Sequence, residues 1–236
     1  MGRLNFSGAK IVIPVDGPAG SGKSTMAKAI ADYLGWDYLE TGALYRAVGL
    51  SVLDMGGNLN SSEEATFHAK NLNFECRKTS RGWRNYFNGK DATEKLRVER
   101  VSEAASKVSE YPGVRKALLS FQRSFGQKRG AVLDGRDIGT VVFPNARLKF
   151  FMDADIETRI QRRFDELREK GANFDPDLLG EKLRERDERD RNRKEAPLKL
   201  AMDAIRLDTT NLSIDEALHA MLEKVSREYG QPIDLV

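Results

Sequence analysis

One glycine-rich loop near the N-terminus constrains the fold of this chain more than any other stretch. The apolar run Ile11–Val15 precedes the loop, and a run over 23–34 that we predict to be helical follows it. Strand, glycine-rich turn and helix in this order place converging amide groups next to the positive end of a helix, where a phosphate binds. The loop fits the pattern G-x-x-x-x-G-K-[ST] and consists of Gly17, Pro18, Ala19, Gly20, Ser21, Gly22, Lys23, Ser24 and Thr25. We expect all nine residues to contact a nucleoside triphosphate.

Two side chains of this loop have predictable roles. Lys23 can reach the β- and γ-phosphates, and the hydroxyl group of Ser24 can bind Mg²⁺. We therefore expect ATP as co-substrate, Mg²⁺ as cofactor and Lys23 as a catalytic cation. The loop alone does not distinguish a kinase from a GTPase or a motor ATPase.

The sequence after a second apolar run argues against those other classes. A GTPase typically carries N-K-x-D for guanine, which is absent, and a motor ATPase typically has a longer chain with an Asp-Glu pair at a strand end. Here the run 131–133 is followed by Asp134, Gly135, Arg136 and Asp137. Asp134 could hold Mg²⁺ through water, and Arg136 could neutralise phosphate charge. A simple polar β-turn is the alternative interpretation.

Strand-like and helix-like runs alternate along the rest of the chain. Apolar runs predict further core strands at 131–134, 148–152 and 205–208. Helix-period patterns and helix-start signals predict helices over 45–53, 61–72, 97–109, 112–127 and 177–193, and after Ser213. This alternation is typical of the α/β class, with a parallel sheet core flanked by helices.

A different pattern interrupts this alternation. The runs 73–77 and 83–87 are strand-like, and Asn88-Gly89 after the second run is a hairpin-turn signal. We therefore predict a small antiparallel β insert, within a segment that we place at 57–97.

The size and charge of the chain fit one globular domain. We predict that the 236-residue chain has a loose leader at 1–9, followed by a single domain over 10–236. The 39 basic and 36 acidic residues nearly balance, without the unopposed basic stripe of a nucleic-acid binder. No early apolar run is long enough for a signal peptide or a membrane span. We expect a cytoplasmic monomer with no nucleic-acid or membrane partner, since no apolar stripe is left unexplained.

Few residues are available for thiol or zinc chemistry. Cys76 is the single cysteine and cannot form an internal disulfide. His68 and His219 lie far apart in the sequence and are expected on helix surfaces. A zinc site is therefore not predicted.

Arginines gather in the segment 156–193. At 100° per residue, one face of the predicted helix 177–193 carries Arg186, Arg189, Asp190 and Arg193. One side of the preceding helix carries Arg159, Arg162 and Arg163. Two such helices joined by a turn at 171–175 suit a mobile lid that closes over a triphosphate and excludes water. The alternative is a salt-bridged surface helix, but exposed i,i+4 ion pairs contribute only about 0.3–0.5 kcal/mol each.

Four blocks of the sequence together resemble the bacterial-type cytidylate kinase family. They lie at 41–46, 105–115, 134–144 and 186–193, and the resemblance extends from about 11 to 229. It implies a P-loop kinase that transfers the γ-phosphoryl group of ATP to CMP or dCMP, with a small extra sheet near the monophosphate. One departure is Glu40, where the family usually has Asp.

The resemblance also implies roles for individual residues. The residues expected to contact the acceptor are Thr41, Tyr45, Arg46, Ser106, Arg115, Arg136, Asp137, Arg186 and Asp190. Of these, Ser106, Arg115 and Asp137 would read cytosine, while Arg46 and Arg136 would lie near the acceptor phosphate. The ATP site would consist of the loop with Arg159 and Arg163. The expected catalytic cations are Lys23, Arg136, Arg186 and Arg193.

Elementary chemistry makes this acceptor reasonable. The 4-amino group of cytosine is a donor that Asp137 could accept, whereas uracil would turn an acceptor oxygen toward it. A phosphate monoester has a second pKa near 6 and is largely dianionic at neutral pH, so in-line transfer needs no general base. Two alternatives stay open: a kinase for another acceptor, such as dephospho-coenzyme A, shikimate or another nucleotide, and a nucleotide-gated switch protein.

Overall fold

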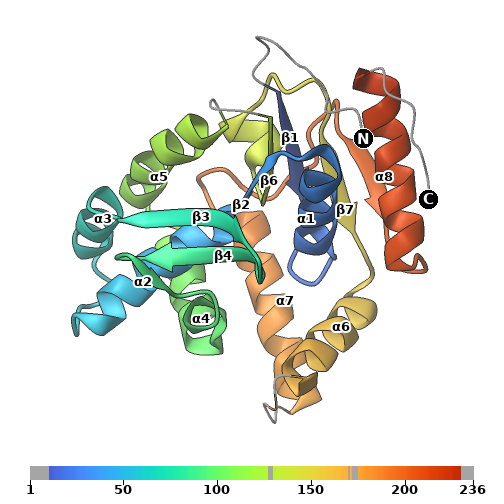
Figure 1. Cartoon of the computed structure of the whole chain (residues 1–236). Coiled ribbons are helices and arrows are strands. Elements are labelled where there is room, and N and C mark those ends of the chain that lie inside the picture. Colours follow the sequence, from blue (N-terminus) through green and yellow to red (C-terminus); the bar gives the residue numbers. More distant parts are fainter. Residues whose placement is uncertain (1–10, 127–129, 170, 172–174, 230–236) are drawn as a thin grey trace.

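A computed structural model of the chain describes residues 11–126, 130–169, 171 and 175–229 (Figure 1). The predicted leader at 1–9 lies outside these residues, as does most of the predicted turn at 171–175. The core is a five-stranded parallel sheet in the order β2-β6-β1-β7-β8. Its strands are β1 Val12–Asp16, β2 Asp37–Glu40, β6 Ala131–Gly135, β7 Phe150–Asp153 and β8 Ile205–Asp208.

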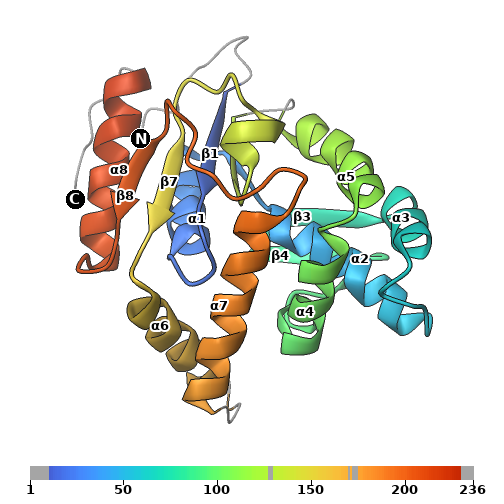
Figure 2. The same ribbon diagram turned by 180° about the vertical axis from the view of Figure 1, so that it is seen from behind.

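Helices cover both faces of this sheet, as Figures 1 and 2 show from opposite sides. The helices of the described residues are α1 Lys23–Leu34, α2 Thr41–Asp54, α3 Ser62–Lys70, α4 Glu99–Val108, α5 Pro112–Phe125, α6 Ile156–Glu169, α7 Pro176–Asn192 and α8 Ile214–Tyr229, of which α3 packs on α2 and α5, and α6 packs on α7. Successive side chains of a strand point to opposite faces, so each strand serves two cores. Val12 and Leu39 pack with α2, α4 and α5, whereas Ile13 and Tyr38 pack with α1 and α8. The predicted α/β class with a parallel sheet is confirmed.

The predicted antiparallel insert is also present. It contains β3 Phe74–Thr79, β4 Gly82–Phe87 and β5 Lys90–Asp91, in that order. The β4–β5 turn has positive φ at both central residues, Asn88 (50°) and Gly89 (76°), as a two-residue hairpin requires. Trp83 packs edge-on against Tyr38, with the ring centroids 5.6 Å apart, and so joins the insert to the core.

Some local features differ from the sequence-based expectation. The helix expected over 97–109 is present as α4, and a 3₁₀ turn that was not predicted, η1 Lys95–Arg97, precedes it. The segment after β6 is a π-helical turn, η2 Ile138–Val142, which was not predicted. Within the described residues, no helix combines the length and apolarity needed to cross a membrane.

Candidate active site

A cavity of about 790 Å³ opens at the carboxyl ends of β1, β2 and β6. The glycine-rich loop 17–22 follows β1 directly and forms its floor, and Asp134 and Arg136 enter it from the end of β6. Helices α6 and α7 form the opposite wall, so side chains from distant parts of the chain meet here. Ligands of open α/β sheets bind at this edge.

The loop has the geometry of a phosphate cradle. Gly20 and Gly22 have φ of 77° and 82°, in the left-handed region that glycine adopts without strain. A Cβ on Gly20 would lie 2.9 Å from the backbone oxygen of Arg159, so this position has no room for a side chain. Gly22 leads into α1, whose first amides face the cavity at the positive end of the helix.

Lys23 is buried beneath this loop, and its Nζ donates to the carbonyl of Pro18 at 2.9 Å. Burial, followed by the positive charges of Arg136 and Arg186, lowers the pKa of the Lys23 amine to about 7, against the opposing negative charge of Asp134. An anion bound in the cavity would reverse this depression. Lys23 is therefore placed to be most strongly cationic when a polyphosphate is present.

Ser24 and Asp134 lie side by side, as expected of a Mg²⁺ site. The Ser24 hydroxyl donates to the Asp134 carboxylate. Burial, followed by the neighbouring Glu40 carboxylate, raises the pKa of Asp134 to about 6, against the opposing positive charge of Lys23. Among the described residues, no group of three or more His, Cys, Asp or Glu side chains could hold a metal. One hydroxyl and one carboxylate fit Mg²⁺, which keeps waters and takes further ligands from substrate phosphates.

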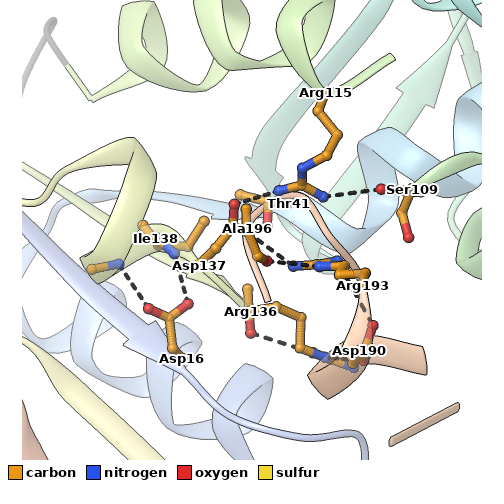
Figure 3. Close-up of polar contacts among 12 residues, drawn as sticks. Asp16, Thr41, Ser109, Arg115, Arg136, Asp137, Ile138, Asp190, Arg193 and Ala196 are labelled. Carbon is orange, nitrogen blue, oxygen red and sulfur yellow. Dashed lines mark hydrogen bonds and ion pairs between the residues drawn. The ribbon is translucent and has the colours of Figure 1, made fainter. Parts of the chain in front are cut away.

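Two of the residues expected to read the base, Arg115 and Asp137, meet near Arg136 and Asp190 (Figure 3). Arg115 forms an ion pair with Asp137 and donates to the backbone oxygen of Ser109 at 3.2 Å. Its guanidinium lies over the Tyr45 ring, 5.6 Å from the centroid. The Ser106 hydroxyl is buried and finds no hydrogen-bond partner in the described part of the chain. A carboxylate, a guanidinium and a free hydroxyl together offer the acceptor and donors that a cytosine edge requires.

The residues expected near the acceptor phosphate form a second, positive group. Arg136 donates to Asp190 at 2.7 Å, and Arg46 pairs with Glu40 at 2.9 Å. Burial, together with the nearby positive charge of Arg136, lowers the pKa of Arg186 to about 10. Buried N–H groups without a hydrogen-bond partner among the described residues are found on Arg46 (Nε) and Arg186 (Nε), both of which line the cavity. Unsatisfied buried donors are uncommon, and these converge on a cavity that could hold an anion.

Other predicted site residues make protein contacts. Thr41 donates to the backbone oxygen of Asp134 at 2.7 Å and thereby ties α2 to β6. Arg159 is buried, pairs with Asp187 at 2.6 Å and donates to the Ala19 oxygen of the loop at 3.1 Å. In this state its guanidinium braces the loop from behind. Arg163 pairs with acidic residues of α4 and α6, at 2.9 and 2.8 Å.

The helical-wheel argument misplaced one lid residue. Arg189 was grouped with Arg186 and Asp190, but it is exposed. The buried face of α7 follows Leu179, Leu183, Asp187 and Asp190, because Leu179 and Leu183 pack toward the protein, although Leu178 is exposed.

Two cavity residues, Lys28 and Arg97, were not singled out from the sequence. They line the cavity together with Glu40 and with Arg162, which was predicted as part of the lid. Lys28 lies one helical turn after Ser24, a spacing that could have revealed it. Arg97 reaches the cavity only through the packing of η1, which no local pattern indicates.

Comparisons with known proteins agree with this geometry. Residues 13–227 match the family model described as "Cytidylate kinase". Curated relatives named cytidylate kinase include those of Aeromonas salmonicida (42% identical, covering 93% of this chain and 95% of the relative), Pseudomonas aeruginosa (43%, 94% and 98%) and Bordetella bronchiseptica (46%, 92% and 96%). A solved shikimate kinase from Bacteroides thetaiotaomicron is 11% identical at a TM-score of 0.45, too remote to bear on function. The chain belongs to the cytidylate kinase family and is a phosphotransferase.

Proposed function

We propose that this protein transfers the γ-phosphoryl group of ATP to CMP or dCMP, giving CDP or dCDP, by in-line displacement without a general base. One observation carries the proposal: a glycine-rich phosphate cradle and a separate group of buried, partly unsatisfied arginines face the same cavity. The first group suits a donor triphosphate, and the second suits the phosphate of an acceptor.

The donor side consists of the loop with Lys23 and Ser24. The loop amides and Lys23 would hold the β- and γ-phosphates, and Arg163 would reach the same nucleotide if it exchanged its carboxylate partners for phosphate. Ser24 directly and Asp134 through water would hold the Mg²⁺ ion, which supplies charge neutralisation between the β- and γ-phosphates. Arg159 would support the loop from behind.

The acceptor side reads the base and holds its phosphate. Asp137 would accept the cytosine 4-amino group, and Arg115 and Ser106 would donate to its acceptor atoms. Tyr45 would pack against the base, and Arg46, Arg136 and Arg186 would bind the phosphate. Thr41 would act on this region through its bond to the strand that carries Asp134, and Asp190 would contact the sugar.

In this proposal, positively charged side chains promote the phosphoryl transfer. The acceptor phosphate is largely dianionic near pH 7 and needs no residue to remove a proton. Lys23, Arg136, Arg186 and Arg193 would screen the repulsion between two polyanions and stabilise the charge that spreads over the transferring group. Helices α6 and α7, predicted as a lid over 156–193, would exclude water from this reaction.

An ADP-release assay across acceptors tests the proposal. CMP and dCMP should accelerate ATP consumption far more than UMP, AMP, GMP, dephospho-coenzyme A or shikimate does. Failure of saturating CMP to accelerate it would refute the proposed acceptor, and slow hydrolysis that ignores every acceptor would instead support a nucleotide-gated switch. A monomeric state and a cytoplasmic location remain predictions from the sequence.

A further inference from the structure

Asp16 is a buried carboxylate for which the proposed reaction has no direct use. It is the last residue of β1 and immediately precedes the phosphate-binding loop. Only 4% of its surface is exposed. Its two oxygens are bound to two consecutive amides on another segment: Oδ1 accepts from Ile138 N–H at 2.9 Å and Oδ2 from Gly139 N–H at 2.7 Å (Figure 3).

These two amides begin the π-helical turn η2. The first N–H groups of a helical turn have no partner within it, and such groups are costly to bury unpaired. Farther along the turn the partners are internal, as between Phe143 N–H and the Ile138 oxygen at 2.7 Å. Asp16, at the end of the strand that leads into the phosphate-binding loop, therefore supplies the two hydrogen-bond acceptors that the first amides of this turn lack.

The residue just before these amides is Asp137. Its φ of −147° and ψ of 21° connect the end of β6 to the turn, so the position of Ile138 and Gly139 fixes where the Asp137 side chain starts. That side chain then meets Arg115, and Arg193 lies 3.7 Å away. A shift of the turn would move the carboxylate away from both cations.

Among the described residues, Asp16 is the side chain that hydrogen-bonds to the amides at the start of the turn. Lys149 is buried nearby, but its Nζ is bound to Asp203 at 2.7 and 2.8 Å and to the Pro144 oxygen. Arg123 donates to backbone oxygens at the far end of the turn, 3.1 and 3.2 Å away. Among charged groups, Asp137 raises and Arg136 lowers the pKa of Asp16, and Asp137 is the residue whose position the carboxylate would control.

We propose that Asp16 is a positioning residue for acceptor recognition: its carboxylate clamps the amides of Ile138 and Gly139 and thereby holds Asp137 where it reads the base. The proposal rests on the proposed function, in which Asp137 reads cytosine. Because Asp16 is bonded through the chain to Gly17, the same carboxylate joins the donor loop to the base-reading turn.

The variant Asp16→Asn tests the clamp with almost no change in shape. The Asn carbonyl oxygen can still accept from one of the two backbone N–H groups, but the Asn NH2 group is a donor and cannot accept from the other. One of the two charge-assisted hydrogen bonds is therefore lost. We expect the KM for CMP to rise and the CMP:UMP ratio of kcat/KM to fall by about 10-fold or more. The KM for ATP should change by less than about 3-fold, because the loop amides are untouched.

Asp203→Asn is the matched control. It removes an ion pair from Lys149 near the other end of the same segment, so it should lower the melting temperature without changing the CMP:UMP ratio. If Asp16→Asn altered the kinetics of ATP, CMP and UMP by one common factor, or left the CMP values unchanged, Asp16 would have no positioning role.

Two further measurements protect the test. If Asp16→Asn does not fold, Gly139→Ala replaces it: the added Cβ would lie 3.3 Å from Asp16 Oδ2 and 3.2 Å from Lys149 Cδ, so it should weaken selectivity in the same direction. In the wild-type chain, the amides of Ile138 and Gly139 should exchange slowly with solvent; fast exchange would refute the clamp. If wild-type protein ignores CMP, the proposed function fails, whatever the exchange result.

Discussion

Replacement of Asp137 by alanine tests base recognition most directly. The Asp137 side chain is buried, pairs with Arg115 and lies 3.7 Å from Arg193. Alanine removes the proposed acceptor for the cytosine amino group and leaves Arg115 without its paired carboxylate, whereas Arg193 keeps Asp190. A hydrogen bond to a charged group contributes about 1.5–3 kcal/mol, so kcat/KM for CMP should fall by about 10- to 150-fold.

UMP should respond differently to the same change. With Asp137 as base reader, the O4 oxygen of UMP would face a carboxylate that repels it in the wild type, and in the variant O4 would face the cations that surround Asp137, Arg115 and Arg193. The kcat/KM for UMP should therefore stay constant or increase, so the CMP:UMP ratio falls by at least about 10-fold.

A coupled ADP-release assay with kcat and KM determined for each acceptor measures this ratio. Asp32→Ala is the control, because it removes a carboxylate that pairs with Lys78 and Trp83 away from the cavity. It should leave the ratio unchanged. A folded Asp137→Ala protein that still preferred CMP as strongly as wild type would refute the assignment of Asp137 as the base reader.

Three further predictions concern the donor site and pH. Lys23→Ala should abolish turnover while calorimetry still detects CMP binding; retained turnover would exclude Lys23 as a catalytic cation. Ser24→Ala should raise the Mg²⁺ concentration needed for half-maximal rate several-fold, measured by titration at fixed ATP, and an unchanged requirement would contradict its role. Burial raises the pKa of Asp16 to about 7, against the pull of its two backbone bonds, so the carboxylate gains a proton as pH falls below 7. The CMP:UMP ratio, in which the titration of the acceptor phosphate cancels, should therefore decrease from pH 8 to pH 6 in wild type and stay flat in Asp16→Asn.

Much of the fold could be predicted because its signals are local. The apolar run before the glycine-rich loop marks β1, and Asn88-Gly89 marks the hairpin turn of the insert. β2 escaped prediction since its four residues, Asp37–Glu40, include two carboxylates and form a strand only by pairing with β6. β5 has two residues and exists only as a partner of β4.

The sequence identifies several residues that line the cavity, among them Lys23, Arg136 and Arg186, but not the contacts that they make. The spacing on α7 indicates that Arg186 and Asp190 share a face, but it cannot show that Arg189 is exposed, because the rotation of a helix depends on what it packs against. The bonds between Asp16 and the turn after β6 join residues 122 and 123 positions apart. No local pattern contains such a contact.

The buried cations of the cavity have a consequence for the empty protein. The positive charges of Arg136 and Arg186 lower the pKa of Lys23, and that of Arg136 lowers the pKa of Arg186, so an anion that enters the cavity would offset this repulsion. Ligands that bind only the folded state shift the folding equilibrium toward it. The nucleotide-free form is thus the one most open to unfolding and proteolysis, so the abundance of this protein in a cell would follow the supply of its own substrates.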